Sequence, residues 1–238
     1  MRLTPIQRLK PPSEEFWFGT DFLGRDVYAR TIYGTRISLM VGGAVALIST
    51  AIGLAIGLFA GYVRWVDAVV MRIMDGLMAI PGILLAIALI ALAGASLTNV
   101  IIAIAVPEIP RVVRLVRSVV LTIREQPYVE AAVAVGSPLP KILFKHILPN
   151  TVAPLIVQAT YVCASAVVVE AILSFLGAGT PPEIPSWGNV MAEGRVYFQI
   201  APWIIFFPGM LLAIAVLAVN VLGDGLRDSL DPRIARRM

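Results

Sequence analysis

Long apolar runs separated by short charged stretches dominate this chain, and the runs predict membrane-spanning helices. Residues 37–63 carry no charged side chain, and these 27 residues suffice to cross about 30 Å of hydrocarbon with some tilt. We expect the second helix to be kinked near its start by Pro81. The pattern predicts an all-α, polytopic membrane protein with five spans, at residues 37–63, 76–95, 97–106, 151–176 and 201–222.

The third predicted span is short and runs into a charged segment. We expect its helix to leave the bilayer at Pro107, with Glu108 just beyond it. Three arginines then follow at helical spacing: Arg111, Arg114 and Arg117. They either extend their long side chains to the cytoplasmic face or line a polar pathway, with Glu108 as an available partner.

Composition supports an integral membrane protein. The 238 residues are 58% hydrophobic and 14% charged, with a mean hydropathy of +0.86 and a net charge of +4. The basic residues cluster in a few connecting segments, which indicates membrane topology and no nucleic-acid partner. Cys163 is the single cysteine and His146 the single histidine, so we expect no intrachain disulfide and no metal site built from cysteine and histidine.

Catalytic signatures are missing from the sequence. No Gly-Lys pair is present, which excludes a phosphate-binding loop of the G-x4-G-K-[ST] type and an ATPase site in this chain. No serine lies in G-x-S-x-G, and one histidine excludes H-E-x-x-H. We therefore expect no catalytic residue and no cofactor bound by this chain.

Two features within the predicted spans have different interpretations. Gly53, Gly57 and Gly61 recur at every fourth residue and predict a smooth face for close helix packing. Glu170 is the single charge in the fourth predicted span. It is either a group on a transport pathway or a carboxylate with a hydrogen-bonded structural role near the outer interface.

A polar, proline-punctuated interruption at residues 130–150 separates the third and fourth spans. It begins with a short helix carrying Glu130, Ala131 and Ala132, and we expect a break at Gly136. Ser137 is the expected cap of a second helix ending at Pro149. One side of that helix is basic, with Lys141, Lys145 and His146, and the other is an apolar stripe of Ile142, Leu143, Ile147 and Leu148.

The distribution of basic residues predicts the topology. If residues 130–150 lie inside, the inside segments hold twelve of the 19 Lys and Arg residues, whereas the outside loops hold Arg195 alone. This orientation places residues 1–36 in an extracytoplasmic or interfacial segment, 37–222 in the transmembrane domain with a cytoplasmic loop at 125–150, and 223–238 in a cytoplasmic tail. Residues 1–36 hold the other six basic residues, so we expect an additional span upstream.

Individual residues in the two predicted outer segments indicate a helix cap and an interfacial anchor. Thr20 or Asp21 is the expected cap of a short helix through Ile32, which either lies along the membrane interface or forms a solvated lead-in. Residues 177–200 form an outer loop in which Trp187 is an expected interfacial anchor. Glu183 and Glu193 in this loop either meet a transported solute or act as solvated or capping carboxylates.

The interruption resembles the EAA loop of permease subunits in bacterial ABC importers, which reads EAA, three residues, Gly, nine residues and I-x-L-P. The matching residues are Glu130, Ala131, Ala132, Gly136, Leu148 and Pro149, with His146 at the first Ile position. The form HILPN resembles the dipeptide, oligopeptide and nickel branch of that family. So do the strings GTDFLGRD (19–26), YGTRISL (33–39) and SFLGAGTPPEIPSWG (174–188).

This resemblance implies the C-type permease of a type I importer, in a bacterial inner membrane. That permease has six spans in the family, the first of which is missing from the five predicted here. The resemblance assigns ATPase coupling to Glu130 and Gly136, with the flanking matched residues, and leaves ATP and magnesium to the partner ATPase subunits. Further implied partners are a homologous second permease subunit, with the Gly53 face as a candidate contact, and an extracytoplasmic substrate-binding protein docked on loops including 177–200.

Several functions remain open from the sequence. The resemblance favours import of di- or oligopeptides, with nickel or another small solute as the alternative cargo. A stand-alone channel or secondary transporter would need a charged or broken-helix site at mid-membrane. A membrane-embedded enzyme would need a catalytic constellation, which the sequence does not offer.

Overall fold

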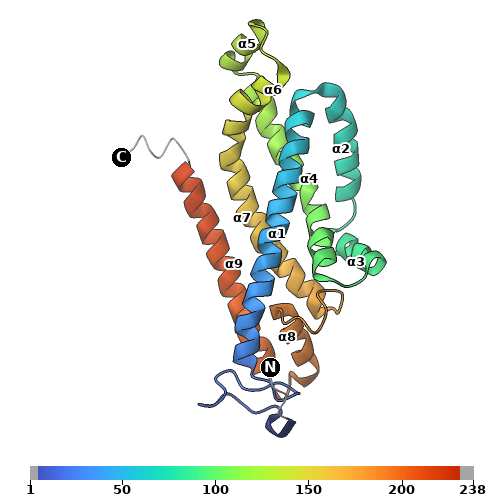
Figure 1. The fold of residues 1–238 in the computed structure, drawn as a ribbon, viewed down its shortest axis with the longest axis vertical. Coiled ribbons are helices and arrows are strands. Elements are labelled where there is room, and N and C mark those ends of the chain that lie inside the picture. Colours follow the sequence, from blue (N-terminus) through green and yellow to red (C-terminus); the bar gives the residue numbers. More distant parts are fainter. Residues whose placement is uncertain (1–4, 231–238) are drawn as a thin grey trace. The chain divides into compact units, whose positions relative to one another are not determined.

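The computed structural model describes residues 5–230, and all of its regular elements in that range are helices (Figure 1). Their order is η1 (Pro5–Gln7), α1 (Val27–Tyr62), α2 (Arg64–Met78), α3 (Gly82–Ala93), α4 (Leu97–Arg124), α5 (Pro127–Ala134), α6 (Leu139–Lys141), η2 (Ile142–Ile147), α7 (Leu148–Phe175), α8 (Trp187–Gly194), η3 (Arg195–Tyr197) and α9 (Trp203–Leu230).

The described residues form two compact units. Unit 1 contains residues 5–45, 83–104 and 163–219, and unit 2 contains residues 46–82, 105–162 and 220–230. Four long helices, α1, α4, α7 and α9, contribute one part to each unit. The predicted coupling loop lies wholly in unit 2, whereas the N-terminal segment and α8 lie in unit 1.

The number of apolar helices differs from the sequence prediction. Among residues 5–230, three helices are long and apolar enough to cross a membrane, at Val27–Tyr62, Leu139–Phe175 and Trp203–Leu230. A fourth arises if the bent pair of α2 and α3 counts as one span. The third predicted span, at 97–106, belongs to α4, which stays helical from Leu97 to Arg124 through two internal prolines and carries too many charges to qualify.

The prediction of residues 76–95 as a single kinked helix was wrong. Residues 64–75, expected as a loop, begin helix α2, and the chain then bends by 87° between α2 and α3. Pro81 lies at this bend, where its missing N–H and its ring disfavour a continuous helix. The two helices therefore replace the single kinked helix expected at 76–95.

The ends of the other spans also differ. Helix α1 is one continuous helix of 36 residues, so the short N-terminal helix and the first span are fused. Its start is capped by Asp26, whose Oδ1 accepts the Tyr28 N–H at 2.9 Å, and neither Thr20 nor Asp21 performs this role. Helix α9 continues to Leu230, beyond the expected start of the tail at 223, and residues 231–238 lie outside the described range.

Candidate functional site

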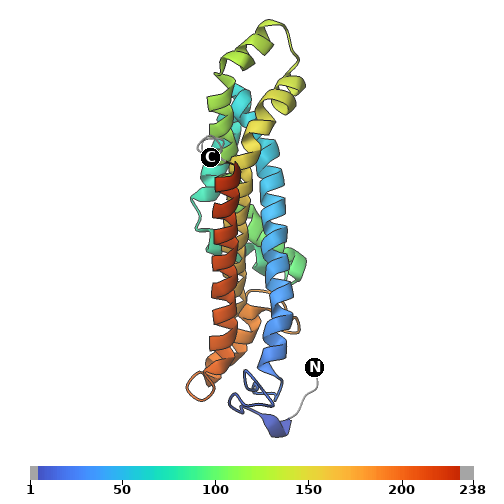
Figure 2. The ribbon, with the colours of Figure 1, turned by 90° about the vertical axis from the view of Figure 1, so that its left-hand side faces the viewer.

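The predicted coupling loop consists of two helical pieces joined by a tight turn in unit 2, which we call the coupling segment (residues 127–149). Figures 1 and 2 show it beyond the connection between α1 and α2, at the end of α4 and the start of α7. Pro127 opens α5, and Glu130 lies in its first turn. A carboxylate there favours the helix, because it lies near the positive end of the helix dipole.

Gly136 ends α5 in a Schellman motif. Its φ is +77°, in the left-handed region. The Ser137 N–H donates to the Ala132 carbonyl at 3.0 Å, and the Gly136 N–H donates to the Val133 carbonyl at 2.9 Å. These are the two hydrogen bonds that define the motif. A glycine is favoured here because it adopts positive φ without a Cβ penalty, so Gly136 fixes the direction in which the chain leaves α5.

The second piece of the coupling segment differs from the prediction at both ends. Pro138, and not Ser137, is the residue that precedes the helix, and no side chain caps it. The helix does not end at Pro149 but runs on through η2 into α7. Residues 142–147 form a π-helical turn in which the Leu148 N–H donates to the Leu143 carbonyl, five residues back. This wider turn accommodates Pro149, which has no N–H to donate.

The predicted apolar stripe of the coupling segment is buried within unit 2. Ile142, Leu143 and Ile147 are at most 3% exposed, Leu148 is half-buried, and α5 packs against η2 through this region. Asn150 ties the two pieces together, since its side chain donates to the Tyr128 hydroxyl at 3.3 Å and to the His146 carbonyl at 2.8 Å.

A different set of apolar side chains is exposed on the coupling segment. They are Tyr128, Val133, Val135 and Phe144, with exposed fractions of 46–81%. Among the matched motif residues, Glu130, Ala131, Gly136 and Pro149 are exposed as well, and Ala132 is half-buried. The sequence spacing of residues 142–148 could not reveal this exposed surface. The turn at Gly136 decides which face of the second helical piece packs against α5, and this turn is not part of the spacing pattern.

The predicted glycine face packs against α4 within unit 2. A Cβ atom built on Gly53, Gly57 or Gly61 would lie 2.5–2.7 Å from the Cβ of Val112, Val116 or Val120, respectively. These distances are shorter than any van der Waals contact, so the helices approach only because the side chains are absent. The face is thus covered by this chain's own α4, and the expectation that a second permease subunit packs there is wrong.

The three arginines of α4 each have an acidic partner in unit 2. Arg117 forms an ion pair with Asp67 of α2, and Arg114 pairs with Asp75 of α2 at 2.5 Å. Arg111 contacts Glu108 one turn earlier at 3.2 Å, beside a small pocket of about 170 Å³ at the end of α2. Arg114 and Arg117 therefore join α2 to α4, whereas Arg111 pairs within α4 with Glu108, the one acidic partner that the sequence suggested.

Glu170 lies in a buried polar network of unit 1. Its carboxylate is 0% exposed and accepts hydrogen bonds from Ser174 at 2.8 Å and from Ser38 at 3.2 Å. The Trp187 N–H in turn donates to Ser38, and the Trp187 indole donates to the Thr31 carbonyl at 3.1 Å. These hydrogen bonds agree with the second interpretation of Glu170 from the sequence, a carboxylate with a hydrogen-bonded structural role. Trp187 is 1% exposed, so its assignment as an interfacial anchor was wrong.

A second charged network fixes α8 to the beginning of α1 in unit 1. Asp21, which is fully buried, accepts hydrogen bonds from the side chains of Arg25 at 2.6 Å and Arg30 at 2.8 Å. Both arginines also pair with Glu193 of α8. Three of these four residues belong to the string GTDFLGRD and to the helix that follows, so the string is a structural clamp on the outer loop.

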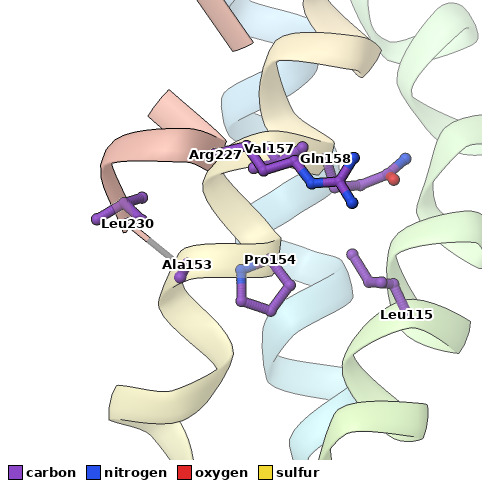
Figure 3. Close-up of a pocket in the computed structure, with 7 residues that line it drawn as sticks. All are labelled: Leu115, Ala153, Pro154, Val157, Gln158, Arg227 and Leu230. Carbon is purple, nitrogen blue, oxygen red and sulfur yellow. The ribbon is translucent and has the colours of Figure 1, made fainter. Parts of the chain in front are cut away.

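One pocket lies in unit 2 between α4, α7 and α9 (Figure 3). It has a volume of about 410 Å³ and mostly apolar walls, with two polar side chains, Gln158 of α7 and Arg227 of α9. None of the sequence-predicted site residues lines it.

The sequence profile of the binding-protein-dependent transport system inner membrane component family matches residues 53–236. The chain belongs to this family. A probable peptide ABC transporter permease of Sinorhizobium fredii is 59% identical over 99% of this chain and 81% of the relative. A dipeptide transport system permease of Alkalihalophilus pseudofirmus is 47% identical, with 97% and 76% covered. These relatives confirm the identification as an ABC transporter permease.

Solved structures agree on the fold. A chain of the MetNI methionine ABC transporter, solved in an inward-facing conformation, superposes with a TM-score of 0.70 over 85% of this chain and 97% of that chain. The sequence identity is 21%, so this similarity concerns the fold alone. It confirms the predicted all-α fold.

Proposed function

We propose that this chain is one of two permease subunits of an ATP-driven importer that carries di- or oligopeptides across a bacterial inner membrane. The family and the names of the relatives support this assignment, since the relatives are named as peptide and dipeptide permeases. The observation that carries the proposal is the coupling segment, because it presents the matched motif and an exposed apolar surface on a rigid turn.

The partner proposed for the coupling segment is a separate ATPase subunit, which would bind the ATP and magnesium. A short helix with exposed apolar side chains is suited to a hydrophobic groove on a soluble domain. Tyr128, Val133, Val135 and Phe144 would supply the apolar contacts, while Glu130 and Lys145 are exposed beside them. No residue of this chain is assigned a catalytic role.

Continuous helices would transmit movement of the ATPase to the membrane-spanning part of the chain. The second piece of the coupling segment continues without a break into α7, and the Schellman turn fixes the first piece relative to the second. Movement of a docked ATPase would therefore move α7 as a rigid element and would shift the population between inward-open and outward-open states. A homologous permease subunit would complete the pathway, and a substrate-binding protein would deliver the solute on the outer side.

The direct test is transport by the assembled complex. The chain is co-expressed with its ATPase, second permease and binding protein, reconstituted into proteoliposomes, and assayed with radiolabelled dipeptide. We expect uptake that requires both ATP and the binding protein. Uptake of nickel in place of dipeptide would assign the alternative cargo, and uptake without ATP would contradict the importer assignment and favour a channel or secondary transporter.

A further inference from the structure

The pocket between α4, α7 and α9 has the size and chemistry of a peptide site. Its volume of about 410 Å³ lies within the range of small-molecule sites in proteins, about 300–1,000 Å³. Leu115, Pro154 and Val157 form apolar walls, and none of the lining residues within 5–230 is acidic. Figure 3 shows the Arg227 and Gln158 side chains at this pocket, extending from two different helices.

Arg227 differs from three arginines of α4 in the same unit. Arg111, Arg114 and Arg117 each form an ion pair with an acidic residue. Within residues 5–230, Arg227 forms no ion pair, although it reaches a pocket that is otherwise mostly apolar. A guanidinium is suited to bind a carboxylate with two parallel hydrogen bonds, and a neighbouring amide supplies a further donor.

The position of the pocket links it to the coupling segment. Four of its seven lining residues, Ala153, Pro154, Val157 and Gln158, come from α7. Ala153 follows Pro149 by four residues of the same helix, which is about 6 Å along its axis. Any displacement of the coupling segment therefore acts directly on the walls of this pocket.

We propose that this pocket binds the carboxyl-terminal end of the transported peptide on the cytoplasmic part of the pathway. Arg227 and Gln158 would hold the free carboxylate, and the apolar walls would contact the last side chain. This inference rests on the proposed function, because it takes a peptide as the solute. It adds a specificity-determining contact in the permease, which would hold the peptide until α7 moves.

The test uses the purified complex without binding protein and a dipeptide that carries photoleucine and a free carboxylate. After illumination, we expect adducts on residues 153–158 or 227–230. Substitution Arg227→Gln should lower the labelling about tenfold, the loss expected when 1.4 kcal/mol of binding is removed. The matched control is Arg72→Gln, which removes an exposed arginine of α2 in the same unit and should leave the labelling unchanged.

Competition identifies the recognised group. An unlabelled dipeptide with a free carboxylate should compete about tenfold better than the same dipeptide as a carboxyl-terminal amide. Equal competition, adducts elsewhere in the chain, or labelling that is removed by anionic lipid but not by peptide would overturn the proposal, the last result in favour of a lipid headgroup.

Two further measurements keep the test decisive. If Arg227→Gln prevents assembly, the uncharged substitution Gln158→Leu takes its place, with the same expected loss of labelling. ATP-driven dipeptide uptake by the unsubstituted complex is measured in parallel. Uptake with labelling independent of Arg227 and Gln158 overturns the pocket assignment alone, whereas absence of uptake contradicts the proposed function.

Discussion

Single glycines decide how closely α1 and α4 approach each other in unit 2. Gly53, Gly57 and Gly61 each face a valine of α4, and none of them has room for a methyl group. The spacing of these glycines predicted a packing face but not its partner. The partner could not be read from the sequence, because any helix with small or branched side chains would fit the same face.

Substitution Gly57→Ala tests this contact. The new Cβ would lie 2.7 Å from the Val116 Cβ, so we expect a destabilisation of about 1–3 kcal/mol from overpacking. The matched control is Gly43→Ala in the same helix, where no atom lies within 4 Å and the substitution should be neutral or stabilising by about 1 kcal/mol. Thermal unfolding of the purified protein in detergent gives both values. An unchanged unfolding midpoint for Gly57→Ala would contradict the close approach.

Glu193 is a second residue whose substitution should lower the stability of the protein. It pairs with Arg25 and with Arg30, which is 2% exposed, so Glu193→Gln would leave the buried Arg30 and the half-buried Arg25 with Asp21 as their one acidic partner within residues 5–230. We expect the free energy of unfolding to fall by about 1–3 kcal/mol. Glu183→Gln, an exposed glutamate of the same loop, is the control. Comparable proteolysis of the outer loop in both variants would refute the clamp.

At the scale of elements, the coupling segment shows what sequence patterns reveal and what they miss. The break at Gly136 follows from local chemistry and was predicted correctly. The continuation through Pro149 was missed, because a π-helical turn supplies a geometry that rules for ordinary helices do not include. The amphipathic helix α2 was mistaken for a loop, since its charges pair with α4 and only tertiary structure shows their partners.

Gly136 offers a test of this element. Its left-handed φ costs a branched residue about 1–2 kcal/mol, although a Cβ there would meet no atom within 4 Å. We expect Gly136→Val to reduce ATP-driven uptake, because the direction of the chain after α5 would change. Gly136→Asn should retain most of the uptake, since asparagine tolerates this conformation. If both variants transported equally well, the Schellman turn would not matter for coupling.

At the scale of the whole molecule, the assignment joins a fold, a docking surface and a pathway. The all-α fold and the family were predictable from the apolar pattern and the motif strings, because both are local in sequence. The Arg227 pocket was not, since residues far apart in the chain build it. The apolar docking surface was not either, since the turn at Gly136 decides which side chains of the coupling segment are exposed. Helix α7 lines the pocket and continues directly from η2, which carries Phe144 of the docking surface, so it connects the proposed ATPase docking to the proposed peptide site.

We propose that the exposed apolar side chains of the coupling segment bind a separate ATPase. Val135 is 81% exposed in the described chain, and a charge at this position would be buried in the proposed interface. Co-purification of the ATPase with a tagged permease measures the association directly. We predict that Val135→Asp weakens it by about tenfold or more, since 1.4 kcal/mol corresponds to a factor of ten. Thr122→Asp, which adds the same charge to an exposed position of α4 outside the segment, should bind ATPase like the unsubstituted protein. Full ATPase recovery with Val135→Asp would show that this surface does not bind the ATPase.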